Sequence, residues 1–346
     1  MTAESSVSQQ ASHRPDEGPR WSSPPDALHT VRDAAYLRDL QEEAEFWDAR
    51  PQTLLTIATS SVIQEYINER LTGHRERQWF ETISEHGDFK RGCMLGAGPG
   101  EVEAHLLAQH DGLSLTIYDI SSETLARLAA RLEQDFAGRF ETCREDLNFI
   151  ELPPSSYDLF VADSSIHHIL NLEHLAYQVN RALTPDGWFF LRDTVSENYF
   201  QFSDEKKRLY ELAISLAYEN PQEAPPIAWP DRNDWQFSPF ESVRSEEILG
   251  TFSQYFQEVS VRATYTMLGL CLFGPQLLPT EAPPPAGLGT RLRRLLGRGR
   301  DEPRRSITRD RLQVLGDLLF ALDRLAGETG MAPGMAFAVY RKRAGT

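Results

Sequence analysis

The sequence predicts an α/β protein built on a doubly wound parallel sheet. Three observations predict this fold class. Short apolar runs alternate with amphipathic helical segments between residues 92 and 193. A glycine turn follows the first apolar run. An aspartate follows or ends each of the next four apolar runs. Strand–helix alternation of this kind is typical of parallel strands joined by right-handed crossovers.

Helices are expected before the sheet begins. Residues 1–26 are rich in Ser, Gln, Pro and charge, which predicts a disordered tail. From Ala27 to Glu85 apolar residues recur at helical spacing, and we expect Pro51 and Gly73 to separate three helices.

The sheet and its helices follow in strict alternation. Strands are expected at residues 92–95, 113–119, 139–146, 157–163 and 187–193, with helices at 101–110, 121–136 and 172–183. Ser121 or Ser122 is the expected N-cap of the second helix, because a serine side chain accepts the free N–H groups of a helix start.

The C-terminal part departs from this rhythm. We expect helices at 204–218, 244–254 and 308–327, a loop rich in aromatic residues and proline at 225–240, and strands at 258–267 and 336–343. The Pro- and Arg-rich stretch 279–305 is expected to be a solvated linker, with contact to an anionic partner or a membrane as the alternative.

These elements predict the following division of the chain. We expect a disordered tail (1–26), an N-terminal helical cap (27–88) and a cofactor-binding core (89–197). After the core we expect a substrate or lid insertion (198–256), C-terminal strands of the core sheet (257–268 and 335–343), a mobile insertion (269–307) and a helix (308–329).

Composition excludes several classes of function. The 346 residues carry a net charge of −16, from 51 acidic and 35 basic side chains, which opposes binding to nucleic acid. No run of 18 apolar residues is present, so no membrane span is expected. The three cysteines form no CxxC pair, and the N-terminal stretch has no apolar core of a signal peptide. We therefore expect a cytoplasmic protein without a metal site.

The glycine turn is the first candidate binding motif. It has glycines at positions 96, 98 and 100, followed by Glu101 and an apolar helix. Alternate glycines let the backbone approach a ligand closely, and the helix start presents free N–H groups. A dinucleotide motif would require glycine where Glu101 stands, which disfavours an NAD-linked oxidoreductase. The spacing suits a ligand that carries one carboxylate and an ammonium group.

Acidic side chains at strand ends complete the expected site. Asp119 is placed to accept the two ribose hydroxyls of a nucleoside, and Asp146 lies where an adenine amino group is expected. Asp163 and Asp193 end the next two strands. Because ligands of open α/β sheets bind at the carboxyl ends of strands, we expect all four acids to converge on one crevice.

The residues from Arg91 to Asp193 resemble the class I S-adenosylmethionine-dependent methyltransferases. The stretches that carry the resemblance are MLGAGPG, IYDIS, REDLNFIELP and YDLFVADSSIHHILNLEHLAYQVNRALTPDGWFFLRD. The flanks at Tyr66–Gly73 and Pro239–Leu249 are similar to a bacterial subgroup of that family. The resemblance implies a Rossmann-like seven-stranded sheet and S-adenosylmethionine as cofactor. The cofactor-binding residues that it implies are Gly96, Ala97, Gly98, Gly100, Asp119, Ile120, Asp146, Leu147, Asp163 and Ser164.

The chain departs from that family at Met94, where an acidic residue is common. Asp163 or a residue of the helical cap is expected to substitute for it.

For catalysis, an oxygen acceptor must lose a proton, and imidazole is suited to accept it. His167 and His168 follow the fourth strand, and we favour His167 because it is the first to follow the turn. Asp193 and Glu197 are the competing bases, and a structural role for both histidines is the alternative.

The expected function is transfer of a methyl group to an oxygen or nitrogen of a small molecule, such as a secondary metabolite or a sugar-like acceptor. The chain reads Asp163-Ser164-Ser165-Ile166 in place of the NPPY-like tetrad of nucleic-acid amino methylation. The aromatic loop and the helical cap are the expected walls of the substrate site. The alternative is a non-catalytic S-adenosylmethionine-binding partner or scaffold protein. The sequence specifies neither the acceptor nor an oligomeric state.

Overall fold

A seven-stranded sheet forms the centre of the protein. The computed structural model describes residues 23–49, 61–217, 220, 222, 226–227, 229–265 and 309–343. The strands are β1 (Arg91–Leu95), β2 (Ser114–Asp119), β3 (Phe140–Arg144), β4 (Tyr157–Asp163), β5 (Leu183–Thr194), β6 (Phe256–Thr264) and β7 (Met335–Lys342). Their order is β3-β2-β1-β4-β5-β7-β6. The expected doubly wound, Rossmann-like fold is confirmed.

The sheet is mixed rather than wholly parallel. Strands β1 to β5 pair in parallel, whereas β7 is antiparallel to both of its neighbours, β5 and β6. The reversal occurs where strand–helix alternation ends in the sequence.

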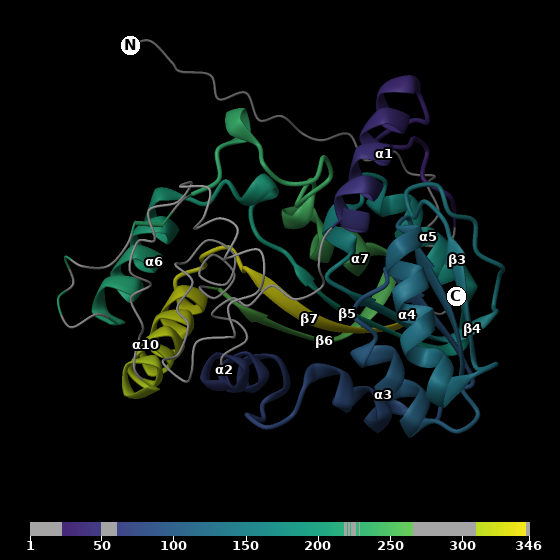
Figure 1. Cartoon of the computed structure of the whole chain (residues 1–346), viewed down its shortest axis with the longest axis horizontal. Coiled ribbons are helices and arrows are strands. Elements are labelled where there is room, and N and C mark those ends of the chain that lie inside the picture. Colours follow the sequence, from purple (N-terminus) through teal and green to yellow (C-terminus); the bar gives the residue numbers. More distant parts are fainter. Residues whose placement is uncertain are drawn as a thin grey trace, which may run out of the picture.

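Helices cover both faces of the sheet (Figure 1). The α-helices are α1 (Ala34–Ala49), α2 (Ser61–Thr72), α3 (Glu101–Gln109), α4 (Ser122–Phe136), α5 (Leu172–Ala182), α6 (Asp204–Ala217), α7 (Ile248–Tyr255) and α10 (Arg309–Glu328). Short 3-10 helices are η3 (Trp79–His86), η4 (Ile166–His168), η5 (Asn198–Phe200), η7 (Arg232–Asp234) and η8 (Ser245–Glu247). Ser121 is the N-cap of α4, because its Oγ accepts the N–H of Thr124 at 3.0 Å.

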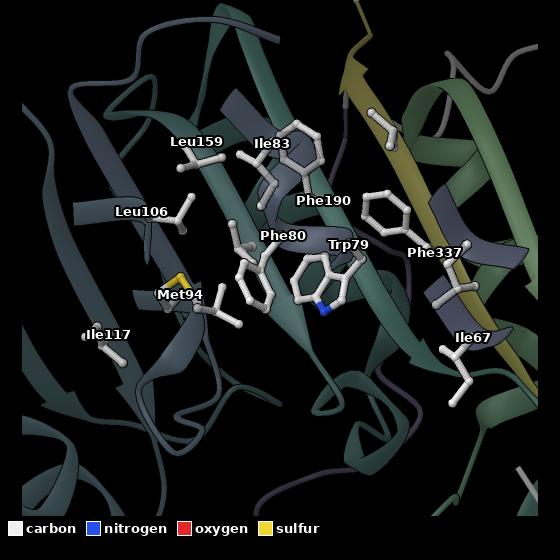
Figure 2. Packing of buried hydrophobic residues seen from close by; sticks show 14 of the residues in the cluster. Ile67, Trp79, Phe80, Ile83, Met94, Leu106, Ile117, Leu159, Phe190 and Phe337 are labelled. Atoms are coloured by element: carbon white, nitrogen blue, oxygen red, sulfur yellow. The ribbon is translucent and has the colours of Figure 1, made fainter. Parts of the chain in front are cut away.

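Alternate side chains of the strands build two apolar layers. On one face Met94, Ile117 and Phe190 pack with residues of η3, α3 and α4. Figure 2 shows Trp79 and Phe80 of η3 over this layer, close to Phe190 and Phe337. The opposite layer joins strand residues to α5 and α7. Burial on both faces explains why the central strands read as nearly continuous apolar runs.

Several expectations fall outside the described residues. They concern most of the tail at 1–26, Pro51 and the insertion at 269–307. In the part of the chain that the structure describes, no helix has both the length and the apolar character needed to cross a bilayer.

Strand register brings the expected site residues to one edge of the sheet. Leu95, the last residue of β1, pairs with Tyr118 of β2 and Ala162 of β4. The residues that follow, Gly96, Asp119 and Asp163, therefore stand level at the carboxyl ends of three adjacent strands. This edge lies where the strand order reverses about β1, which is where ligands of such sheets bind.

Candidate active site

The glycine loop after β1 has a backbone that only glycine fits well. Gly96 and Gly100 both have φ of +88°. A Cβ atom on Gly96 would lie 2.4 Å from Cβ of Ser165, and one on Gly100 would lie 2.7 Å from Cδ1 of Leu128. The N–H of Gly96 donates to the carbonyl of Tyr118 at 2.8 Å, which anchors the loop to β2.

The remaining glycine faces open space. A Cβ atom on Gly98 would meet nothing within 4 Å, and Gly100 is the N-cap of the nine-residue helix α3. A loop that leaves room at Gly98 and ends at a helix start can accept a ligand against its backbone.

Asp119 joins this loop to the end of β2. Its Oδ2 atom accepts the N–H of Ala97 at 2.8 Å, and Oδ1 accepts the N–H of Ser121 at 2.7 Å. Burial raises the pKa of Asp119, against the effect of these two donors. The neighbouring carbonyl of Ile120 accepts Nε of Arg144 at 3.0 Å. Each carboxylate oxygen has about two acceptor positions, so Asp119 can still accept hydroxyl groups.

Asp146 has a partner that the sequence did not predict. The hydroxyl of Tyr36, on α1, donates to both carboxylate oxygens at 3.0 and 2.9 Å. The N–H of Asn148 also donates to Oδ1 at 3.0 Å, and Leu147 is buried next to it. The helical cap therefore contacts the carboxylate expected to meet adenine.

Asp163 and Ser164 lie at the same edge but are tied to β5. Asp163 pairs with Arg192, its partner in strand register, and the N–H of Ser164 donates to the Arg192 carbonyl at 2.8 Å. Burial raises the pKa of Asp163, and Arg192 opposes the shift. Ser164 has φ of +53°, a conformation that an L-residue rarely adopts.

Glu103 is a buried carboxyl group that sequence reasoning missed. It stands on α3, is 2% exposed, and lies on the buried side with Leu106 and Leu107. Burial raises the pKa of Glu103 to about 7, although a hydrogen bond to the Gly98 backbone opposes the shift. Spacing of three and four residues from two buried leucines was the signal available in the sequence. Met94, the site of the missing acid, is packed in the apolar core.

His167 does not suit the general-base role for which we favoured it. Its Nδ1 lies 2.5 Å from Oδ1 of Asp193, and its Nε2 lies 3.3 Å from Oε1 of Glu241. Burial alone would lower the pKa of His167, but the two carboxylates outweigh burial and raise it to about 10. An imidazolium that already carries both protons cannot accept another near neutral pH.

Asp193 is also poorly placed as a base. Its side chain is fully buried and accepts the N–H groups of Ser165 at 3.0 Å and Ile166 at 2.7 Å. Although burial raises its pKa, the His167 charge and these donors hold the pKa of Asp193 below its usual value. The structure therefore makes Asp193 a support for His167. The competing base, Glu197, forms an ion pair with Lys206 at 2.8 Å.

His168 is the more open of the two histidines. Its side chain is 13% exposed, its Nδ1 lies 3.0 Å from Oε1 of Glu43, and Trp47 packs edge-on against its ring. We call the group formed by His167, His168, Glu43 and Glu241 the His–Glu cluster. The cluster joins η4, α1 and the segment before η8.

The aromatic loop packs largely on its own neighbours. Trp229 contacts Tyr210 of α6, with ring centroids 5.6 Å apart, and Trp235 contacts Tyr199 at 5.7 Å. Phe240 reaches α1, where its ring stacks on Tyr36 at 5.6 Å. The end of this loop therefore approaches the candidate site.

Comparisons with known proteins give a family match for one segment of the chain. Residues 94–189 match a family model described as a methyltransferase domain. No protein among the curated sequences matches the chain.

Three solved structures align with most of the chain. A Galdieria sulphuraria protein described as a sarcosine dimethylglycine methyltransferase is 12% identical, with a TM-score of 0.46 over 88% of this chain and 98% of that one. An S-adenosylmethionine-dependent methyltransferase from Mesorhizobium loti is 16% identical, with a TM-score of 0.43 over 82% and 99%. The [4+2]-cyclase SpnF is 13% identical, with a TM-score of 0.45 over 93% and 99%.

The glycine loop lies at the switch point of the sheet order, and the matched residues 94–189 include its glycines and the strands on either side of it. The chain therefore contains a methyltransferase domain over this segment.

Proposed function

We propose that the protein transfers the methyl group of S-adenosylmethionine to an oxygen or nitrogen atom of a small molecule. The observation that carries the proposal is the hydrogen bond from Ala97 to Asp119. It brings a glycine-lined helix start and a fixed carboxylate to the same edge of the sheet. That combination suits a nucleoside that carries an amino-acid group.

The residues at this edge fit each part of the cofactor. Asp119 would accept the ribose hydroxyls, and the backbone around Gly98 would face the amino-acid end, where Glu103 supplies the acid missing at Met94. Asp146 and Leu147 would meet the adenine. Bound S-adenosylmethionine supplies a methyl group already activated by its sulfonium charge, so the protein has mainly to align the acceptor, which can supply about 7–11 kcal/mol.

His168 is the proposed proton acceptor for an oxygen substrate. It is the histidine of the cluster with the more exposed side chain, and it lies beside the end of β4. The net charge of −16 and the absence of an NPPY-like tetrad favour a small molecule over a nucleic acid. A nitrogen acceptor that is neutral at working pH would need no such base.

The test combines cofactor binding with turnover. The full-length protein would be titrated with S-adenosylmethionine by calorimetry and then incubated with a panel of alcohols, phenols and amines. We expect binding, together with S-adenosylhomocysteine and a singly methylated product in at least one reaction. Absence of binding would overturn the proposal. Tight binding without acceptor-dependent S-adenosylhomocysteine would favour the alternative, a non-catalytic partner or scaffold protein.

A further inference from the structure

We infer that the His–Glu cluster binds one divalent transition-metal ion of the Zn²⁺ type, with His167, His168 and Glu241 as its ligands. One ligand atom from each of these residues lies within 4.8 Å of the others. Zinc takes two imidazoles and a carboxylate in known classes of site, with metal–ligand distances of about 2.0–2.2 Å. Such distances separate neighbouring ligand atoms by about 3.5 Å, so small side-chain rotations complete the site.

The His167 ring is oriented as a ligand, and metal binding would release the proton that its Nε2 shares with Glu241. Its Nδ1 faces Asp193 at 2.5 Å, which leaves Nε2 directed at Oε1 of Glu241, 3.3 Å away. Asp193 is held in turn by the backbone N–H groups after β4. A carboxylate that fixes the far nitrogen of a histidine is the usual support of a metal-binding imidazole.

The His168 ring provides an independent observation. Its Nδ1 is buried, and although it lies 3.0 Å from Glu43, the two groups do not have hydrogen-bond geometry. Oε1 of Glu43 accepts Nε1 of Trp47 at 2.7 Å, and Oε2 accepts the N–H of Phe240 at 2.8 Å. Because Nδ1 makes no hydrogen bond of regular geometry, the ring can rotate toward a metal ion without breaking one.

The charge of the surroundings favours a cation. Three carboxylates, those of Glu43, Asp193 and Glu241, are each at most 7% exposed and surround two imidazoles. The group keeps a negative charge even if both rings are protonated. Because buried charges interact strongly in a medium of low dielectric constant, a divalent cation stabilises this arrangement.

The ion would connect parts of the chain that are distant in sequence. His167 and His168 belong to η4, at the sheet edge, whereas Glu241 lies in the segment before η8 and Glu43 lies on α1. This position beside the proposed acceptor site also makes the ion available to polarise an acceptor oxygen, a consequence that rests on the proposed function. With an ion bound, His168 is a ligand and not a proton acceptor. This inference differs from the sequence-based expectation of no metal site.

The experiment is a metal titration of the full-length protein after treatment with a chelator. Co²⁺, whose visible absorption reports tetrahedral coordination by nitrogen and oxygen, and Zn²⁺ would each be added while binding is followed by absorption and calorimetry. We expect one ion per chain and a higher melting temperature with metal. Glu241→Gln and His168→Asn should each weaken binding at least about 100-fold, as expected for loss of a direct ligand.

Matched controls are Glu85→Gln and His86→Asn on η3, which should bind the ions like the unmodified protein. The inference is overturned if the unmodified protein binds Co²⁺ no more tightly than the two cluster variants. It is also overturned if the Co²⁺ absorption spectra of the unmodified protein and the two variants are the same. If His168→Asn fails to fold, judged by circular dichroism, the near-isosteric Glu241→Gln decides. The readout does not depend on methyl transfer, so failure of the proposed function leaves it unaffected.

Discussion

The backbone N–H of Ala97 donates a 2.8 Å hydrogen bond to Oδ2 of Asp119, which joins the glycine loop after β1 to the last residue of β2. The other oxygen of the same carboxylate accepts the N–H of Ser121. One side chain therefore shapes the loop and also provides the proposed ribose contact. Cofactor affinity should depend on this carboxylate more than on a carboxylate elsewhere that also accepts two backbone N–H groups.

Asp119→Ala should lower the affinity for S-adenosylmethionine about 10- to 150-fold. The reason is the loss of charge-assisted hydrogen bonds to the ribose, which together are worth about 1.5–3 kcal/mol. Calorimetric titration measures the change.

The control is Asp158→Ala at the opposite edge of the sheet. Asp158 also accepts two backbone N–H groups, those of Lys90 at 2.9 Å and Arg91 at 3.0 Å. Its loss should affect stability in a similar way and leave cofactor affinity unchanged. Equal losses of affinity in both variants would show that Asp119 acts only on the fold.

Tyr36→Phe should raise the affinity for S-adenosylmethionine about fivefold. The Tyr36 hydroxyl occupies both oxygens of Asp146, and a hydrogen bond of this kind is worth about 1 kcal/mol net. Without the hydroxyl, Asp146 keeps the N–H of Asn148 and the ion pair with Arg32 at 3.5 Å, and its oxygens gain acceptor positions for the adenine amino group. A drop in affinity would instead mean that Tyr36 itself contributes to the cofactor site.

Glu103→Gln should flatten the dependence of stability on pH. Burial raises the pKa of Glu103 to about 7, whereas an unfolded glutamate has a pKa near 4.3. Between these values the native state keeps a proton that the unfolded state has released, so the free energy of unfolding falls as pH rises. The loss across this window is on the order of 3 kcal/mol.

Urea unfolding at several pH values between about 5 and 8 measures this slope. Glu101→Gln is the matched control, since Glu101 lies on the same helix with an exposed side chain. An equal slope in the unmodified protein and in Glu103→Gln would contradict the prediction.

In the metal-free protein, His168→Ala should lower turnover about 10²- to 10⁴-fold while cofactor affinity stays the same, because it removes the proposed proton acceptor and no cofactor contact. The rate of S-adenosylhomocysteine formation with a confirmed acceptor measures the effect, and His86→Asn serves as the control. Full turnover in His168→Ala would rule out His168 as the proton acceptor.

Local patterns explain what could be predicted. The strands β1 to β5, the N-cap at Ser121 and the glycine loop lie within a few residues of their expected positions. Each depends on periodicity or on turn residues a few positions apart, and such short-range patterns are visible in the sequence alone. Strand-end alignment then follows from parallel pairing, which explains why Asp119 and Asp163 stand level with Gly96.

By itself, the sequence determined the sheet and the acids along one edge, because short-range apolar spacing dictates these features. Only the tertiary structure decided the state of those acids and of the histidines. Tyr36 meets Asp146 across 110 positions, and Glu43 meets the Phe240 backbone across 197. Glu241 and Asp193 enclose His167 and raise its pKa to about 10. Burial and charge pairing depend on distance in space, and no spacing along the chain encodes them.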